Sequence, residues 1–204
     1  QPYFHYAFLW YDKAKKEKIT DNMKKQEKID VIQKGINETA ICRCYFTYDL
    51  NYFYYYPHAV NDKFILGQDE YDFILNGYCI RKISQLKKVE VKDDTYNEIN
   101  RMFGITSQVI NPNIDISSWQ SIFSSLMRLN IYVEIEDALN EQYSIGIIKK
   151  VLKDKLYFKQ FDADGIWDED DLEIRYSQIT SVKWGTRYAE YWKRYLEREQ
   201  ESCT

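Results

Sequence analysis

The alternation of apolar and polar residues is clearest in the second half of the chain, where it predicts a run of short strands. Residues 131–136 carry Ile or Val at every odd position and Tyr or Glu at every even position. A period of two is typical of a strand with one buried face. Related patterns predict four further strands, at residues 145–152, 156–161, 172–176 and 179–184.

Helical spacing precedes and follows these strands. Ser117-Ser118-Trp119-Gln120 matches a capping box, and apolar residues then recur on one side of a helix, at Trp119, Ile122, Phe123, Leu126 and Met127. Thr186 is expected to cap a final helix. We expect the apolar stripe of that helix to face the core; it comprises Tyr188, Tyr191, Trp192, Tyr195 and Leu196.

The first half has a weaker pattern. A leading helix is expected within residues 12–28, although a solvated loop fits as well, because Ile19 and Met23 are the only large apolar residues there. The basic residues between Lys13 and Lys34 alternate with acidic ones, which favours a solvated face over a phosphate-binding surface.

Two segments of the chain resemble each other. Ile80–Val89 and Ile174–Val182 share the pattern Ile-Arg, then Ser-Gln, then an aliphatic residue, then Val. Upstream, Ile36-Asn37-Glu38 is aligned with Leu139-Asn140-Glu141, and residues 49–53 with 153–158. Because these matches keep the same order, we predict an internal duplication.

The pattern of several short strands with tight turns and flanking helices resembles that of the SH3-like and Sm-like small barrels. The resemblance lies in the order of elements, since no signature motif accompanies it. It implies a mainly β fold with flanking helices, built from two duplicated small antiparallel SH3/Sm-like barrels. The expected boundaries are a first barrel at 1–104, a linker at 105–116 and a second barrel at 117–204.

Composition and charge narrow the functional classes. Aromatic residues make up 17% of the chain, including 19 Tyr, and the net charge is −4, so the overall basic field of many nucleic-acid binders is absent. The four cysteines lack zinc-site spacing. Cys42 and Cys44 are expected on one face of a strand, as buried free thiols of a cytoplasmic protein. No segment is long and apolar enough to span a bilayer, so no membrane partner is expected.

An acidic segment is the strongest candidate for a cation site. Six acids and no base lie between Asp162 and Asp171. Placing Gln160 first in a twelve-residue calcium loop puts Asp162, Asp164, Asp168 and Asp171 at ligand positions and Gly165 at the sharp turn. The alternative is a hairpin turn with Trp167 packed below it and no cofactor.

A tyrosine-rich strand is the candidate partner-binding surface. In Tyr52-Phe53-Tyr54-Tyr55-Tyr56, the first, third and fifth residues share one face. An exposed row of Tyr52, Tyr54 and Tyr56 would suit a protein partner or stacked bases. The alternative is that both faces of the strand are covered.

Motifs of phosphate-binding loops, serine hydrolases and zinc proteases are absent from the sequence. We therefore expect a non-enzymatic binding or regulatory module that acts through protein–protein contacts, for example as an immunity or adaptor protein. A nucleic-acid-binding protein that uses a small-barrel face is the first alternative. A cation-binding protein or metal-dependent enzyme built on the acidic turn is the second.

Overall fold

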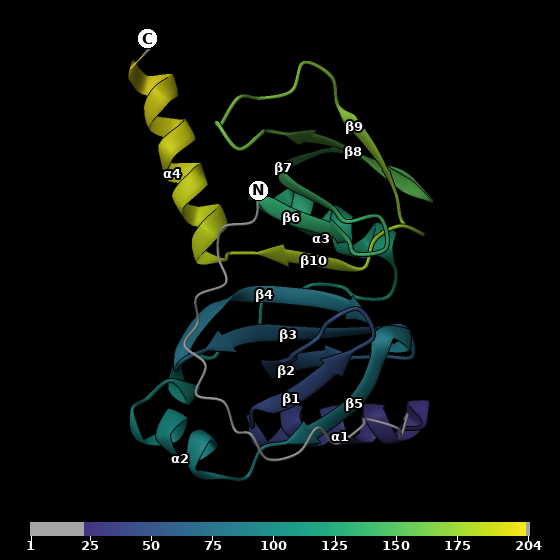
Figure 1. Cartoon of the computed structure of the whole chain (residues 1–204), viewed down its shortest axis with the longest axis vertical. Coiled ribbons are helices and arrows are strands. Elements are labelled where there is room, and N and C mark those ends of the chain that lie inside the picture. The colour runs from purple at the N-terminus through teal and green to yellow at the C-terminus, as the bar shows by residue number, and fades with distance from the viewer. Residues whose placement is uncertain (1–22, 203–204) are drawn as a thin grey trace.

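The computed structural model describes residues 23–202 as one antiparallel sheet of ten strands with four α-helices (Figure 1). The helices are α1 (Lys25–Glu38), α2 (Thr95–Met102), α3 (Trp119–Leu129) and α4 (Arg187–Ser202), with 3-10 turns η1 (Ile83–Gln85) and η2 (Thr106–Gln108). The strands are β1 (Cys42–Phe46), β2 (Tyr52–Val60), β3 (Phe64–Tyr71), β4 (Ile74–Lys82), β5 (Leu86–Val91), β6 (Val133–Asp137), β7 (Gln142–Val151), β8 (Lys155–Gln160), β9 (Leu172–Arg175) and β10 (Ser181–Trp184).

The strand order is the same in the two halves of the sheet. The full order is β5-β1-β2-β3-β4-β10-β6-β7-β8-β9, so in each half the last strand lies beside the first. Antiparallel pairing of β4 with β10 joins the halves, with Ile80 opposite Val182. The sheet therefore continues without interruption through the middle of the molecule.

The predicted mainly β fold with flanking helices is confirmed, but the two closed small barrels are not. The sheet is open, with β5 and β9 at its two ends. Ile80-Arg81 lies on β4 and Ile174-Arg175 on β9, which are the fourth strands of their halves. The upstream alignment is wrong, because Asn37 lies within α1 whereas Asn140 lies in the turn between β6 and β7.

α1 lies at the end of the molecule remote from α4, against the strands of the first half (Figure 1). It contacts β2 and β5 and buries Ile32 completely. The approach is close at Gly35, where a Cβ atom would stand 2.5 Å from the Cys42 sulfur. The expected helix at 12–28 lies mostly outside the described residues, and α1 extends ten residues beyond it because Val31, Ile32 and Ile36 supply an apolar side.

α3 follows the predicted pattern, with its start displaced by one residue. The N-cap is Ser118, whose hydroxyl accepts a hydrogen bond from the Ser121 N–H at 3.0 Å. Gln120 therefore does not complete a capping box. Thr186 caps α4 as expected, since its hydroxyl accepts from the Ala189 N–H at 3.1 Å.

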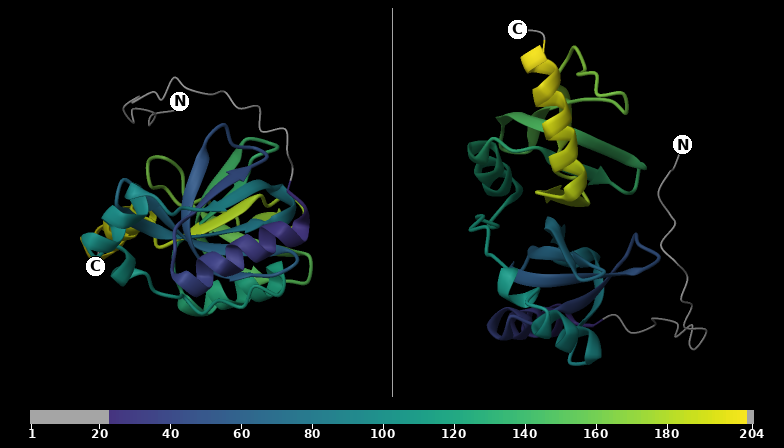
Figure 2. Two further views of the ribbon diagram at one scale, coloured as in Figure 1. Left: turned by 90° about the horizontal axis from the view of Figure 1, so that it is seen from below. Right: turned by 90° about the vertical axis from the view of Figure 1, so that its left-hand side faces the viewer.

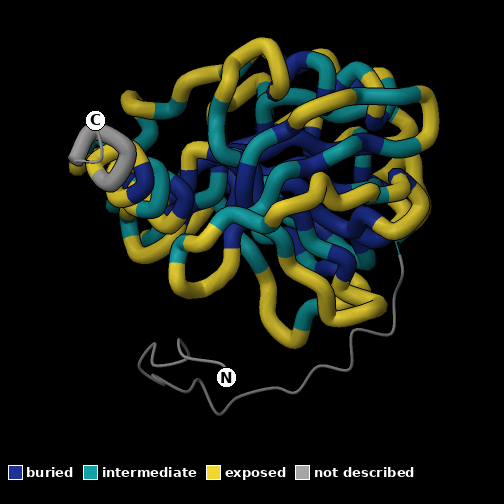
Figure 3. The backbone as a smooth tube through the Cα atoms, turned by 90° about the horizontal axis from the view of Figure 1, so that it is seen from above, coloured by how far each residue is buried: buried dark blue, intermediate teal, exposed yellow. Residues whose placement is uncertain are grey.

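The largest cluster of buried side chains draws on both halves. Leu66 and Ile80 of the first half pack with Trp119, Val182 and Trp184 of the second. In Figure 3 the buried residues follow the central strands, and the exposed ones follow the loops. Burial of this kind is the main favourable contribution to folding, so each half stabilises the other.

The segment between the halves runs along one side of the molecule from α2 to α3 (Figure 2). It does more than connect them, since Ile114 and Ile116 are buried in the shared core. No helix among residues 23–202 is long and apolar enough to cross a bilayer.

Candidate protein-binding surface

The predicted tyrosine row on β2 is only partly exposed. Tyr52 is 45% exposed, whereas Tyr54 stacks on Tyr96 of α2 with ring centroids 4.8 Å apart. Tyr56 is buried, and its hydroxyl shares a hydrogen bond with the Thr106 hydroxyl at 3.0 Å. The structure therefore does not bring these three residues together as an open surface, because α2 and η2 cover the second and third.

The cationic side chain nearest to this row is already paired. Arg43 lies over the Tyr52 ring at 4.6 Å and forms an ion pair with Glu90 at 3.1 Å. Lys88 shares the same carboxylate at 3.4 Å. Both positive side chains beside Tyr52 are therefore paired with the single carboxylate of Glu90, which weakens this surface as a phosphate-binding site.

The acidic segment forms a loop between β8 and β9 that uses its carboxylates in the turn. Asp162 accepts hydrogen bonds from the N–H groups of Asp164 and Ile166, each at 2.9 Å. Asp168 accepts from the Gln160 amide at 2.7 Å. Trp167 packs edge-on against Phe161 with centroids 5.1 Å apart. These contacts are those of the hairpin alternative.

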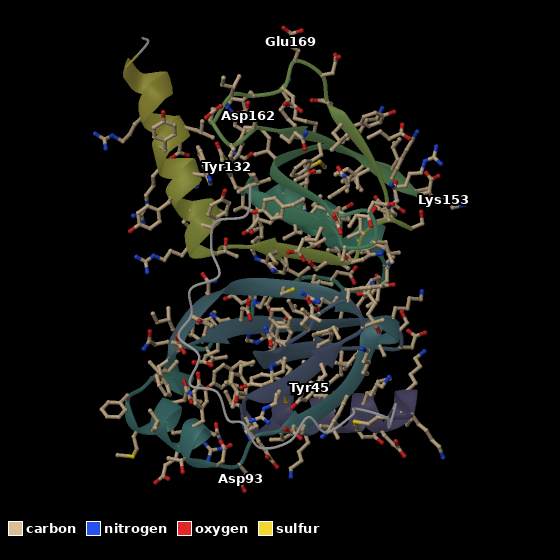
Figure 4. The ribbon with its side chains drawn as sticks, viewed as in Figure 1. Tyr45, Asp93, Tyr132, Lys153, Asp162 and Glu169 are labelled. Atoms are coloured by element: carbon tan, nitrogen blue, oxygen red, sulfur yellow. The ribbon has the colours of Figure 1, made fainter. Side chains whose placement is uncertain are left out.

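The four predicted calcium ligands Asp162, Asp164, Asp168 and Asp171 are not gathered round one point. Within residues 23–202, no three acidic, His or Cys side chains form a group that could hold a metal ion. Figure 4 shows Glu169 at the tip of the loop, with Asp162 at its base on the α4 side. The calcium site remains a prediction without geometric support.

The expectation that the α4 aromatic stripe faces the core is wrong for its tyrosines. Ala189 and Leu196 are buried against Ile145 and Phe161, but Tyr188, Tyr191 and Tyr195 are 53%, 58% and 50% exposed. The five apolar positions span a wider arc than the one side of α4 that meets the sheet. The three tyrosines lie on the part of that arc farther from Ala189 and Leu196, and they are half-exposed.

These tyrosines line a groove with elements from both halves. One part has a volume of about 660 Å³ and is lined by Tyr71, Ile74, Asn76, Arg187, Tyr188 and Tyr191. A second part of about 500 Å³ is lined by Ala163, Asp164, Tyr188, Tyr191, Trp192 and Tyr195. Because the two parts share Tyr188 and Tyr191, we treat them as one surface, the α4 groove.

The tip of the β3–β4 hairpin contributes the far wall of the α4 groove. Tyr71 and Ile74 are each 55% exposed there. Between them, Asp72 and Phe73 have positive φ angles of 49° and 66°, and the Phe73 ring stacks on Tyr96 at 4.7 Å. The stacked Phe73 holds the hairpin tip, and with it Tyr71 and Ile74, in place. Sequence spacing gave no sign that this hairpin would meet the final helix.

A buried ionic network lies where the halves join. Lys183 of β10 pairs with Glu136 of β6 at 3.2 Å, and Arg81 of β4 pairs with Asp49 at 2.5 Å. Burial raises the pKa of nearby Asp69 to about 6. No groove described above includes these groups, so we assign the network to the junction between the halves.

The buried cysteines and His58 do not form a catalytic pair in the described part of the chain. Cys42, Cys44 and Cys79 lie in the core of the first half, whereas the His58 ring packs on Tyr78 at 5.8 Å. Burial also raises the pKa of Cys42 to about 12 and lowers that of His58. A thiolate nucleophile activated by His58 is therefore disfavoured.

No known protein family, curated protein or solved structure matches this chain.

Proposed function

We propose that this chain is a non-enzymatic binding module that acts through protein–protein contacts, with the α4 groove as its contact surface. The observation that carries the proposal is a set of large apolar side chains that are each between 50% and 58% exposed: Tyr71, Ile74, Tyr188, Tyr191 and Tyr195. Contiguous exposed apolar surface is typical of interaction sites. Tyrosine is also enriched among the residues that dominate binding energy.

We further propose that the two halves are duplicated SH3/Sm-like units. The shared strand order and the placement of the two Ile-Arg pairs on fourth strands support this. The helices that precede the first strands give further support, since α1 and α3 both end in a left-handed residue, Thr39 and Asn130. A cytoplasmic location is proposed on the buried free thiols of Cys42, Cys44 and Cys79.

Nucleic-acid binding through Tyr52 remains the first alternative, supported by the ring of Tyr52 under Arg43. The two functions differ in salt dependence, because phosphate contacts weaken steeply as salt rises. Retention of the protein on heparin at 50 mM NaCl with release by about 200 mM NaCl would favour the alternative.

The proposal is tested by placing a photo-crosslinking amino acid, p-benzoylphenylalanine, at single positions of the full chain in its native host. At position 191 we expect one discrete crosslinked protein. At position 98, where Glu98 lies on α2 and does not line the groove, we expect none.

Position 52 separates the two candidate surfaces. Crosslinks from position 52 but not from position 191 would move the binding site to β2 and overturn the α4 groove. For a partner identified at position 191, Tyr191→Ala is expected to weaken binding by about 2 kcal/mol, or roughly 30-fold, as for other interface tyrosines. Tyr52→Ala should leave the affinity unchanged.

A further inference from the structure

We propose that the second part of the α4 groove is an aromatic box for a lysine side chain of the protein partner. That the partner is a protein rests on the proposed function. That the box binds an ammonium group is argued independently of it, from the geometry and charge described below. The box consists of Tyr188, Trp192 and Tyr195, with Asp164 beside it.

The three rings are nearly perpendicular to one another in the two pairs that include Trp192. Tyr188 stands at 81° to Trp192 with centroids 6.3 Å apart, and Tyr195 stands at 83° with centroids 5.8 Å apart. Both tyrosine rings are therefore nearly perpendicular to the Trp192 ring, and all three rings line the same part of the groove. The faces of such rings carry negative partial charge, and ammonium groups enclosed by several of them are bound strongly.

The Trp192 ring of the box is held by further contacts. Trp192 packs on Phe161 with centroids 5.2 Å apart. A Cβ atom at Gly165 would stand 3.0 Å from the Trp192 ring and 3.3 Å from the Tyr195 ring. The acidic loop is therefore packed against two of the three rings, and little reorganisation is needed on binding.

Charge at the box favours a cation over an anion. The loop beside it carries six carboxylates, and none of them forms an ion pair within residues 23–202. Asp164 lines the same cavity as the three rings. Uncompensated carboxylates next to a partly desolvated site attract positive side chains and speed their association.

The cationic side chains of α4 leave the box open. Arg187 and Arg194 lie over Tyr191, each 5.7 Å from its centroid. Lys193 is paired with Glu197 at 4.0 Å. Within the described part of the chain, no Arg or Lys lies over Tyr188, Trp192 or Tyr195. Tyr191, which lies outside the box, is therefore already covered by two guanidinium groups, whereas the three rings of the box are not covered by a cationic side chain of the described residues.

The test uses the full ¹⁵N-labelled chain and three titrants, at constant ionic strength. The titrants are the blocked peptide Gly-Gly-Lys-Gly-Gly, the same peptide with norleucine in place of Lys, and choline chloride. The reporters are the Trp192 indole N–H and the Gly165 amide. We expect saturable shifts with the Lys peptide, at least tenfold weaker binding of the norleucine peptide, and choline no tighter than the Lys peptide.

Variants localise the effect. Tyr195→Leu keeps an apolar side chain without a ring and should lower the affinity for the Lys peptide at least tenfold. Asp164→Asn should lower this affinity several-fold, and Tyr52→Ala should leave it unchanged. Circular dichroism confirms that each variant is folded, and the Gly165 amide serves as reporter throughout.

Three results would overturn the inference: no saturable shift with the Lys peptide, equal binding of the norleucine peptide, or choline bound tenfold more tightly. The last would assign the box to a free small molecule. If position 191 gives crosslinks but any of these results is obtained, the proposed function is supported and the lysine box is ruled out. If the Lys peptide binds but position 191 gives no crosslink, the lysine box is supported and the proposed function is not.

Discussion

The cysteine thiols of the first half are among the most deeply buried groups of the molecule. Cys42 and Cys44 have no exposed surface, and Cys79 has 2%. Burial raises the pKa of Cys42 to about 12 and places those of Cys44 and Cys79 above their usual range. The thiolate that reacts with disulfides is therefore scarce at neutral pH.

We predict that these three thiols do not react with dithiobis(nitrobenzoate) in the native protein at pH 8. In a Cys203→Ser background, which removes the fourth cysteine, the reagent should detect no thiol under native conditions and three in 6 M guanidinium. Rapid reaction of even one thiol in the native protein would contradict the burial of this core.

Asp69 gives a pH dependence with a definite sign. Burial raises its pKa from 3.8 to about 6, so the folded state binds the proton more tightly than the unfolded state. The stability that this group contributes is fully present below about pH 4 and is lost as the pH rises through about 6.

We predict that Asp69→Asn stabilises the protein at pH 7.5 by up to about 3 kcal/mol, given 1.36 kcal/mol per pKa unit. The difference from the unsubstituted protein should shrink toward zero below pH 4. Urea unfolding at pH 4, 5.5 and 7.5 measures it. A destabilising effect at pH 7.5 would mean that Asp69 instead secures Arg81 and Lys183.

Sequence alone could not predict this residue-scale network. Arg81 and Glu136 lie 55 positions apart in the chain, and Lys183 reaches Glu136 only because β10 is inserted between β4 and β6. Local patterns report which face a residue occupies. They carry no information on which strands become neighbours.

At the scale of single elements, periodicity predicted the strands of the second half well. The alternation at 131–136 corresponds to β6, and each of the four other predicted strands overlaps an observed one. The α4 stripe shows the limit of this reasoning, because helical spacing identified the apolar arc but not which part of it meets the sheet. The candidate site was missed for that reason.

The junction of the halves depends on one glycine in β4. Gly77 has a φ angle of 75°, and a Cβ atom there would stand 2.4 Å from the Trp184 carbonyl oxygen. Gly104 has the same φ angle, but its nearest atom would be 3.5 Å away, at Ser107 Oγ. Alanine at either position would therefore adopt the same unfavourable positive φ angle, but only at Gly77 would its methyl group clash with neighbouring backbone.

We predict that Gly104→Ala destabilises the protein by about 1 kcal/mol, the usual penalty of a left-handed non-glycine residue. Gly77→Ala should destabilise it by at least about 2 kcal/mol more, because β4 and β10 must separate to admit the methyl group. Urea unfolding midpoints of the two variants provide the comparison. Equal midpoints would show that the β4–β10 junction accommodates the methyl group without loss of stability.

At the scale of the whole molecule, the shared core argues for a single cooperative unit. Leu66 and Ile80 pack with Trp119 and Val182 across the β4–β10 junction. Separation of the halves would expose this core to water. The sequence suggested two separate barrels because its local patterns do not show the β4–β10 strand pairing that joins the two halves.

We predict one unfolding transition, observed with the same midpoint from each half. In a Trp10→Phe background, which removes the fifth tryptophan, fluorescence of Trp119, Trp167, Trp184 and Trp192 reports on the second half. Thiol exposure of Cys42, Cys44 and Cys79 reports on the first half in the Cys203→Ser background. Two separate midpoints would show that the halves unfold independently.

The open ends of the sheet bear on whether copies of the chain can polymerise. Within the chain, the fourth strand of the first half (β4) pairs with the last strand of the second half (β10). The same kind of pairing between two chains would join the fourth strand of the second half (β9) to the last strand of the first half (β5) of the next chain. That edge of β5 is already engaged, since the Met23 N–H donates to the Lys87 carbonyl at 3.2 Å and the Met23 sulfur accepts from the Val89 N–H at 3.4 Å. The equivalent register would also set Arg175 against Lys88 and Glu173 against Glu90, and like charges directly opposite each other destabilise a sheet. Both features therefore oppose growth of one continuous sheet from chain to chain.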